Sequence, residues 1–342
     1  MIQDKSTLKA VATDAGVSPS TVSRVLNQPH LVTTRTRESV YKALRKYNYT
    51  PPSTSKVPDQ EDRKNSLGVI GLIVHSLKLN VISELVSQFS DEMAKDGGSL
   101  LLLNTNGNRD LLGYMQTHPE IRKKVDALVA FSMEVGDEAA RYFRDLNMPV
   151  VIMQTRVNGL KSISTDNFLG GHDATEFLVS RGYKKIAFVG WNFDDVRLRG
   201  RLSGYRSVIH NVSPDDEPYE AVCFEELSEK GGYTATQRLF SRTSEFPEPP
   251  DAIFYSCDVM ALGGLRYARE HNLNVPQDLG VMGFDNIEAA EIAGLTTMRQ
   301  FLEKKVSMAL DYLKNLHTGE LLEHQDVEVS ITPQLTIRRT TK

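Results

Sequence analysis

The chain has little cysteine and no long apolar run. It contains two cysteines, Cys223 and Cys257, among 342 residues. That is too few for a disulfide framework and indicates a reducing compartment. No apolar segment approaches the ~20 residues that span a bilayer, and the N-terminal residues lack the apolar core of a secretion signal. We therefore expect a cytoplasmic protein that does not enter a membrane.

Motifs of common enzyme and cofactor sites are also missing. The sequence has no Gly-x-Gly-x-x-Gly after a strand, no Gly-Lys-Ser/Thr phosphate loop, no nucleophile elbow and no His/Cys set at metal-binding spacing. Its eight histidines are scattered. We therefore expect no enzymatic activity, no cofactor and no metal site. A Rossmann-type enzyme is an alternative that co-purification of a nucleotide would favour.

The net charge of −4 conceals an uneven distribution. Residues 1–52 carry eight Lys and Arg but three Asp and Glu, so this segment is at +5 and the remainder at −9. A basic head on an acidic body is typical of a small nucleic-acid-binding module attached to a domain that need not touch phosphates. At this length the chain should hold more than one domain.

The basic segment predicts a helix-turn-helix. A first apolar stripe at helical spacing stops at Gly16, which can take the left-handed conformation of a helix end. Ser18 can cap a second helix with Pro19 in its first turn, and a third helix is expected from Thr33. Two short helices around a glycine-containing turn are the arrangement of that motif. The residues expected in the small core are Leu8, Val11, Ala12, Ala15, Val22, Val25, Leu26, Val40, Ala43, Leu44 and Tyr47.

The outward face of the second predicted helix is polar. It carries Ser20, Thr21, Ser23 and Arg24. Hydroxyl groups suit phosphate oxygens, and an arginine can bind a guanine edge through two hydrogen bonds in the major groove. Pattern and length alone leave open the alternative of a small helical domain with a solvated polar face.

Four segments resemble the DNA-binding headpiece of lactose-repressor (LacI/GalR) family transcription regulators: Val11-Ala12, residues 15–18, residues 21–27 and Thr36-Arg37. The resemblance implies that Ser20 and Arg24, with Pro19, read bases. It also implies a set of residues that positions the phosphates: Thr7, Ser18, Thr21, Ser23, Asn27 and Thr33. The implied partner is a near-palindromic operator DNA with half-sites about one turn, roughly 34 Å, apart, bound by a homodimer.

A linker separates this headpiece, residues 1–50, from the rest of the chain. Residues 51–66 contain three prolines and almost nothing apolar, so they cannot form a core of their own. Family members usually carry a hinge helix here that ends in a leucine, but Pro58 occupies that position. Because proline in a helix interior costs about 3 kcal/mol, we expect no ordinary hinge helix. Operator affinity then rests more on the headpieces and on dimerisation.

Residues 67–342 alternate between predicted strands and helices. Short continuous apolar runs indicate strands covered on both faces, as in a parallel sheet, so the class is α/β and doubly wound. Strands are expected at 68–74, 100–103, 127–131, 150–153, 186–189, 221–224, 252–255 and 280–284. Helices include 81–95, 137–146, 170–180, 232–241 and 259–271.

About 270 residues is large for one open sheet, so two halves are expected. This region resembles the family's regulatory core, which is similar to periplasmic sugar-binding proteins and has three crossovers between two subdomains. The resemblance places the N-subdomain at 67–182 and 299–329 and the C-subdomain at 183–298 and 330–342. The expected fold is an all-α three-helix helix-turn-helix headpiece plus an α/β periplasmic-binding-protein-like core of two doubly wound Rossmann-like subdomains.

Polar residues follow several expected strands, at the positions where open α/β sheets bind ligands. For Asn104 and Asp258 we favour a local capping role. The resemblance singles out Arg201 and Asp285, because a guanidinium and a carboxylate can each bind neighbouring sugar hydroxyls. The other predicted ligand-binding residues are His75, Leu79, Asn80, Phe131, Cys257 and Gln300. At Cys257 the family has an asparagine, which leaves the identity of the ligand open.

The resemblance implies a dimeric transcription regulator, a repressor of a carbohydrate-use operon whose operator binding responds to a small sugar-like effector in the cleft. The effector could be a neutral sugar, a sugar acid or a sugar phosphate. A dimer contact is expected at Leu85, Phe89, Met260 and Leu262, although these could equally be internal core. A co-repressor-activated regulator is the first alternative. A solute-binding protein of the transport class is the second, and the headpiece argues against it.

Overall fold

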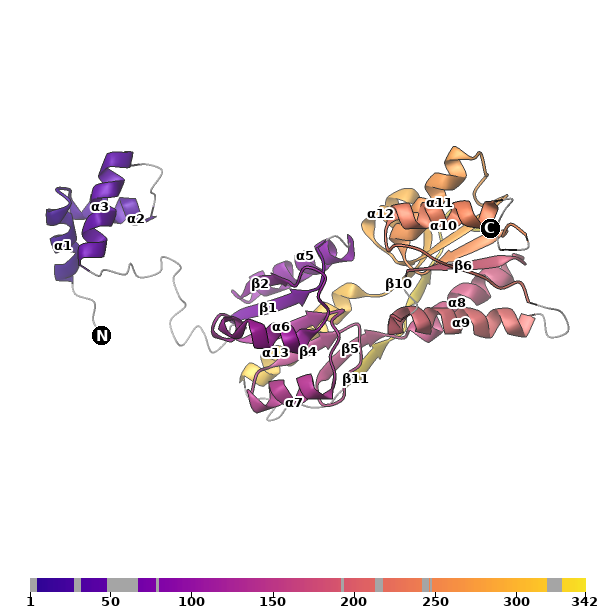
Figure 1. Cartoon of the computed structure of the whole chain (residues 1–342), viewed down its shortest axis with the longest axis horizontal. Coiled ribbons are helices and arrows are strands. Elements are labelled where there is room, and N and C mark those ends of the chain that lie inside the picture. Colours follow the sequence, from indigo (N-terminus) through magenta and orange to yellow (C-terminus); the bar gives the residue numbers. More distant parts are fainter. Residues whose placement is uncertain are drawn as a thin grey trace. The chain divides into compact units, whose positions relative to one another are not determined.

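The computed structural model (Figure 1) describes residues 5–27, 32–47, 67–77, 80–191, 194–212, 218–241, 246, 248–318 and 328–342. The chain divides into two compact units, residues 1–63 and 64–342, in keeping with the predicted headpiece and core. The predicted absence of a hinge helix at Pro58 falls outside the described residues. Among the helices of the described segments, none combines the length and the apolar character that crossing a membrane requires.

The first unit is the predicted three-helix bundle. Its described elements are α1 (Lys5–Asp14), α2 (Pro19–Asn27) and α3 (Thr34–Lys46). Gly16 adopts a φ of +65° after α1, the left-handed conformation that glycine takes without strain. The Ser18 hydroxyl accepts a hydrogen bond of 3.1 Å from the backbone N–H of Thr21, which caps α2. An ion pair of 2.5 Å between Lys46 and Asp14 joins α3 to the end of α1.

The core of this headpiece is small and apolar. Its buried members are Val11, Ala12, Val22, Val25, Val40, Ala43 and Leu44, all of them predicted. Ala15 packs against them, while the side chains of Leu8 and Leu26 lie outside the described set. The prediction is wrong for Tyr47, which is 40% exposed. Tyr47 follows the last residue of α3, so the helical spacing on which the prediction rests no longer applies to it.

The second unit contains two six-stranded sheets in the described part of the chain. The first is entirely parallel and runs in the order β11 (Glu328–Ile331), β5 (Lys161–Thr165), β4 (Val150–Met153), β3 (Ala127–Phe131), β1 (Val69–Val74) and β2 (Ser99–Asn104). The second runs in the order β12 (Gln334–Thr336), β10 (Thr296–Arg299), β9 (Gly280–Asp285), β8 (Ala252–Tyr255), β6 (Ile186–Gly190) and β7 (Ala221–Phe224). In this sheet β12 alone is antiparallel.

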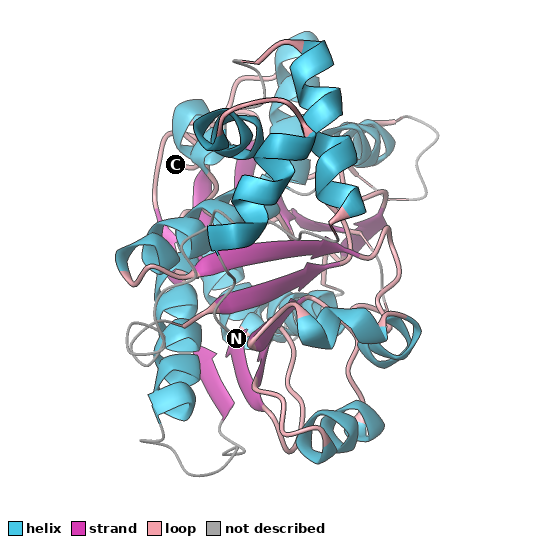
Figure 2. Cartoon of the chain, turned by 90° about the vertical axis from the view of Figure 1, so that its left-hand side faces the viewer, coloured by secondary structure: helices cyan, strands magenta, loops and turns pink. Residues whose placement is uncertain are grey.

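Helices cover both faces of each sheet (Figures 1 and 2), which explains the continuous apolar runs of the central strands. In the first lobe, α5 (Asn80–Lys95) and α13 (Leu302–Thr318) cover one face. The other face carries α6 (Leu111–Thr117), the 3₁₀ segment η2 (Pro119–Lys123) and α7 (Asp137–Asp145). In the second lobe, α8 (Asn167–Ser180) and α9 (Val196–Val212) cover one face. The opposite face carries α10 (Glu229–Phe240), α11 (Asp258–Glu270) and α12 (Glu288–Ala293).

Within the described residues the chain passes between the lobes three times: after β5, after β10 and after β11. The first of these boundaries differs from the prediction. Helix α8 packs against α9, and Phe177 and Leu178 belong to the second lobe's core. The change of lobe therefore comes at Asp166 and not at residue 182. The prediction failed because β5, Lys-Ser-Ile-Ser-Thr, is polar in sequence although every residue of it is buried.

The residues expected at a dimer contact lie mostly inside this chain's own core. Leu85 and Phe89 of α5 are fully buried against the first sheet, and Met260 of α11 is fully buried against the second. The internal-core alternative is therefore correct for these three, because a side chain without exposed surface cannot contact a second chain. Leu262 is half-buried.

Glycines bring the helices of the second lobe unusually close together. A Cβ on Gly171 of α8 would overlap the carbonyl oxygen of Arg201 on α9, and one on Gly204 would overlap that of Phe168. The pair α10 and α11 repeats the arrangement through Gly232 and Gly263. Gly171 lies against the backbone of Arg201. The packing of α8 on α9 therefore also fixes the backbone position from which the Arg201 side chain extends.

Candidate functional site

The outward face of α2 is a solvent-exposed polar surface. Pro19, Ser20 and Arg24 are exposed, and Thr21 is half-buried. Arg24 forms no hydrogen bond or ion pair with any residue that the structure describes. Its guanidinium is therefore available to an external acceptor, as a base-reading arginine must be.

The hydroxyl groups around α2 and α3 partly serve the helix ends. The Ser18 Oγ lies 2.7 Å from the Ser20 Oγ and 2.9 Å from the Thr21 Oγ1. Thr33 accepts a hydrogen bond of 3.4 Å from the backbone N–H of Thr36 at the start of α3. Ser18 and Thr33 thus have capping roles beside the predicted phosphate contacts. The side chains of Thr7, Ser23 and Asn27 lie outside the described set.

A cavity of about 610 Å³, open solvent at its mouth included, lies between the two lobes. Its apolar lining consists of Val81, Phe131, Trp191, Leu227, Val259 and Ile287. Its polar lining consists of Gln154, Arg197, Arg201, Cys257, Asp285 and Gln300. Aromatic faces together with a few polar groups are the composition expected of such a site.

Arg201 is the buried cation of this cavity. Its side chain is 3% exposed, and its guanidinium lies 3.6 Å from the ring centroid of Phe284. The Nε donates to the Asn167 side chain at 2.9 Å, and one terminal nitrogen donates to the backbone oxygen of Ser256. Burial lowers the pKa of Arg201 to about 10, so the group stays charged at neutral pH. Packing and two fixed acceptors therefore hold a cation against the cavity.

Asp285 faces Arg201 at the carboxyl end of β9. The carboxylate lies 3.9 Å from the guanidinium and accepts a hydrogen bond from the side-chain amide of Gln300. Burial raises the pKa of Asp285, although the charge of Arg201 opposes that shift. The φ of Asp285 is +129°, a conformation that side-chain-bearing residues rarely adopt and that clusters at functional sites.

A second charged group joins the lobes. Asp195, whose side chain is 2% exposed, accepts hydrogen bonds from Arg197 at 2.6 and 2.9 Å, both on the second lobe. It also accepts one of 3.2 Å from Arg109 of the first lobe. Burial alone would raise the pKa of Asp195, but the hydrogen bonds and charge of Arg197, then the charge of Arg109, hold it well below its usual range. Arg197 completes the bridge by donating to the Ser132 hydroxyl at 2.7 Å.

Several buried polar atoms at strand ends have no hydrogen-bond partner among the residues that the structure describes. The unpaired atoms include His75 Nδ1, Gln154 Oε1 and Ser256 Oγ, which follow the carboxyl ends of β1, β4 and β8. Buried polar atoms are nearly always hydrogen-bonded in folded proteins. Of these three residues Gln154 lines the cavity, so its carbonyl oxygen is an acceptor available to a ligand there.

The structure brings together most of the predicted ligand-binding residues. Arg201, Asp285, Phe131, Cys257 and Gln300 all line the cavity. His75 is half-buried and does not line it. Leu79 and the side chain of Asn80 lie outside the described set.

Sequence reasoning missed Trp191 and Arg197. Trp191 directly follows β6, the same kind of position as the predicted residues, and its ring lies 5.7 Å from the Arg197 guanidinium. Arg197 precedes Arg201 by one helical turn on α9, so the i, i+4 spacing placed both on one face. Both signals were present in the sequence.

Asn104 has the local role that was predicted, but the prediction is wrong for Asp258, whose hydrogen bonds reach residues far along the chain. The Asn104 side chain exchanges hydrogen bonds with Asn106 in the turn after β2. Asp258 is fully buried and accepts from the Thr297 hydroxyl at 2.5 Å and from the backbone N–H of Ile287 at 3.0 Å. It therefore fixes the loop that carries Asp285.

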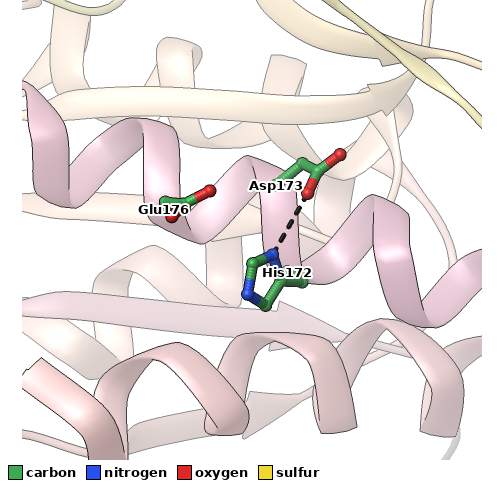
Figure 3. Close-up of side chains that lie close together, drawn as sticks. All are labelled: His172, Asp173 and Glu176. Carbon is green, nitrogen blue, oxygen red and sulfur yellow. Dashed lines mark hydrogen bonds and ion pairs between the residues drawn. The ribbon is translucent and has the colours of Figure 1, made fainter.

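Among the described residues, His172, Asp173 and Glu176 could together hold a metal ion (Figure 3), with ligand atoms within 4.8 Å of one another. His172 and Asp173 are neighbours on α8 and Glu176 lies one turn later, and none of the three lines the cavity. His172 and Asp173 already pair with each other at 3.1 Å. Nothing further about this group indicates a bound ion.

Known proteins share both units. Residues 7–52 match the family model described as bacterial regulatory proteins, lacI family, and residues 175–341 match a periplasmic binding protein-like domain. The chain is 30% identical to the HTH-type transcriptional repressor PurR of Edwardsiella ictaluri (strain 93-146), over 98% of this chain and 96% of that protein. It is 32% identical to the ribose operon repressor of Escherichia coli (strain K12), over 95% and 97% of the two chains.

Solved structures agree in fold. The lac repressor bound to ONPG in its repressed state superposes with a TM-score of 0.67 at 26% identity, over 98% of this chain and 99% of that chain. A complex of the transcriptional regulator CelR with cellobiose gives 0.66 at 24% identity, which shows the fold alone. Relatives of this length and identity carry the same two units in the same order, and the chain belongs to the lacI family of bacterial regulatory proteins, which are DNA-binding transcription regulators.

Proposed function

We propose that this regulator is a repressor of carbohydrate-use genes, and that a small hydroxyl-bearing effector in the cavity between the lobes controls its binding to operator DNA. The observation that carries the effector site is the Arg201–Asp285 pair at 3.9 Å. Arg201 is buried and Asp285 is partly exposed, and the opposite charges face each other at a distance longer than a hydrogen bond. Such a pair can bind neighbouring hydroxyl groups from both sides.

The surroundings of this pair favour a ring-shaped polar molecule. Trp191 and Phe131 supply apolar faces in the same cavity, and Gln154 presents an unpaired carbonyl oxygen. A sugar combines an apolar face with hydroxyl groups at its edge, so it matches both kinds of lining. The ribose operon repressor, at 32% identity, is a relative named for a sugar operon.

DNA binding is assigned to the exposed face of α2. Arg24 and Ser20, with Pro19, read base edges in the major groove, and the hydroxyl groups of Ser18, Thr21 and Thr33 contact phosphates. Thr7, Ser23 and Asn27 complete the phosphate-contacting set. A homodimer presenting two such faces requires a near-palindromic operator.

The DNA-binding assignment is tested by selecting sites from a random duplex library with the full chain. We expect enrichment of a near-palindromic motif. Replacement of Arg24 with alanine should cost about 1–3 kcal/mol and relax the preference at one position of each half-site. Lys42 is an exposed cation on α3, and Lys42→Ala should keep that preference. A library that yields no common motif contradicts the proposal.

The effector assignment is tested by titrating that operator complex with sugars and their derivatives. A compound that lowers operator affinity is an inducer, and one that raises it is a co-repressor, so the same titration decides between the two modes of control. Asp285→Asn keeps the shape of the side chain but removes its charge, and it should abolish the response without changing operator binding in the absence of the compound. A response that survives this change places the effector elsewhere.

A further inference from the structure

Lys305 is a fully buried lysine whose ammonium group is hydrogen-bonded to neutral side chains. It lies in the first turns of α13, immediately after the second crossover, and none of its surface is exposed. Its ammonium group donates to the Thr165 hydroxyl and, at 3.3 Å, to the side-chain oxygen of Gln300. Among the described residues no carboxylate forms an ion pair with it. Removing an ammonium group from water without a neutralising partner costs several kcal/mol, so the position calls for an explanation.

Gln300 connects Lys305 to the cavity. Its side-chain oxygen accepts from Lys305, from the Thr165 hydroxyl at 2.8 Å and from the Gln154 amide at 3.4 Å. Its own amide nitrogen donates to Asp285, and the side chain lines the cavity. One amide group therefore separates the buried ammonium from the site at which the effector is proposed to bind.

Charges around the cavity do not balance. The cations that line it or are linked to its lining through hydrogen bonds are Lys305, Arg201, Arg197 and Arg109. The corresponding carboxylates are Asp285, Asp195 and Asp258. Burial raises the pKa of Asp258 to about 7, so this group is only partly ionised at neutral pH. Burial lowers the pKa of Lys305 to about 7 as well, so both groups are partly ionised. The three arginines still outnumber Asp285 and Asp195 by one.

His75 supplies an independent sign of this excess. Burial and then the charges of Arg109 and Arg197 lower the pKa of His75 to about 4, which keeps the imidazole neutral. Its buried Nδ1 has no partner. Burial and then the charge of Arg201 likewise lower the pKa of Lys305 to about 7. Both groups belong to the first lobe, and neighbouring arginine charges lower the pKa of each.

We propose that the effector is an anion, a hydroxyl-bearing molecule with a carboxylate or phosphate group, and that Lys305 supplies part of the charge that holds it. This inference rests on the proposed function, because it takes the cavity between the lobes as the effector site. Arg201 binds the anionic group directly, and Lys305 acts from behind Gln300 as a positioning residue. A neutral sugar leaves the surplus charge uncompensated and binds more weakly.

Trp191 makes the proposal directly measurable. It is the single tryptophan of the chain and lines the cavity, so its emission reports occupancy. The full chain is titrated at constant ionic strength with glucose, gluconate and glucose 6-phosphate, with ribose and ribose 5-phosphate, and with inorganic phosphate and sulfate against chloride. We expect the anionic member of a responding set to bind about tenfold tighter or more than its neutral counterpart, the order expected for one charge acting through a protein interior.

The matched variants are Lys305→Met and Lys304→Met. Methionine has nearly the length and flexibility of lysine, so Lys305→Met removes the charge and fills the space. It should weaken binding of the anions about tenfold and leave the neutral sugar unchanged. Lys304, the exposed neighbour on α13, should tolerate the change without effect. A purely structural role for Lys305 would weaken neutral and anionic compounds alike, and that outcome overturns the proposal.

The remaining outcomes separate this inference from the function on which it rests. If a neutral sugar binds as tightly as its acid or phosphate and changes operator affinity, the proposal of an anionic effector is wrong. The proposed effector site is then still supported. The inference is also wrong if Trp191 emission responds to no compound, inorganic phosphate and sulfate included. These small ions carry the charge without a carbon skeleton that could be too large or wrongly shaped for the cavity. Operator selection, which needs no effector, then tests the DNA-binding part by itself. Comparison of gluconate with glucose 6-phosphate shows whether the site prefers a carboxylate or a phosphate group.

Discussion

Replacement of Asp195 with asparagine tests the bridge between the lobes. The carboxylate is almost fully buried and accepts from the side chain and the backbone N–H of Arg197 and from Arg109 across the cleft. Asparagine keeps one oxygen and puts an amide nitrogen in place of the other, so two hydrogen bonds from guanidinium groups are lost. At about 1.5–3 kcal/mol for a hydrogen bond to a charged group, the loss of two is about 3–6 kcal/mol. Experiments on broken buried ion pairs give a similar range, about 3–5 kcal/mol.

The assay is urea unfolding of the full chain, followed by Trp191 emission at pH 7. Because Arg197 lies 5.7 Å from that ring, the native emission of Asp195→Asn should also change. Asp194 is the exposed neighbour, and Asp194→Asn should stay within about 0.5 kcal/mol of the unsubstituted chain. Asp195→Asn stability within the same margin would falsify the view that this bridge holds the lobes together.

The same residue predicts a pH dependence with a definite sign. The pKa of Asp195 is lower in the folded chain than in the unfolded one. Its contribution is therefore complete above the unfolded value, near 4, and is lost as the pH falls toward the folded value. The stability difference between the unsubstituted chain and Asp195→Asn should shrink steadily below about pH 4. A difference that stays constant down to pH 3 contradicts this assignment.

Three further changes test other parts of the structure. Gly171→Ala should force α8 away from the backbone of Arg201 and destabilise the core by about 1–3 kcal/mol, with weaker effector binding; unchanged melting refutes the close contact. Gly16→Ala should cost about 1–2 kcal/mol of headpiece stability through its positive φ and lower operator affinity, while melting of the core, followed by Trp191, stays the same. The pKa of Lys305 is lowered to about 7 in the folded chain, so the unfolded chain binds more protons between pH 7 and 10. The free energy of unfolding of the unsubstituted chain should therefore rise with pH in this range relative to that of Lys305→Met. Urea unfolding that gives the same pH dependence for both chains contradicts this.

The sequence predicted the elements whose pattern is set by burial. All eight strands expected from apolar runs are present, with ends within about two residues, the usual uncertainty of such boundaries. The missed strands β5, β10, β11 and β12 are polar, at a sheet edge or both. Strand β5 is buried because it lies between β11 and β4, whereas the edge strands β11 and β12 stay partly exposed, and no local pattern records these positions in the sheets. Helix α9 was missed because its many arginines and glycines mask its apolar face.

The residues of the candidate site were likewise predicted only in part. Arg201 and Asp285 could be assigned because family motifs surround them, and both line the cavity. The roles of Asp195, Arg109 and Lys305 depend on side chains that meet across the cleft from segments far apart in the chain. The resemblance placed Leu85 and Phe89 at a dimer contact and left an internal core as the alternative, since an apolar face fits a second chain and a sheet equally well until the sheet's position is known.

The repeated passage between the lobes has a consequence for synthesis. The first lobe begins at β1 but lacks α13 and β11 until nearly the whole chain has been made, whereas the headpiece is complete within its opening segment. Translation that stops before residue 328 therefore yields a complete DNA-binding headpiece attached to an incomplete effector-binding core. Early termination and C-terminal deletion should accordingly act as uncoupling lesions, which separate occupancy of the operator from metabolic control.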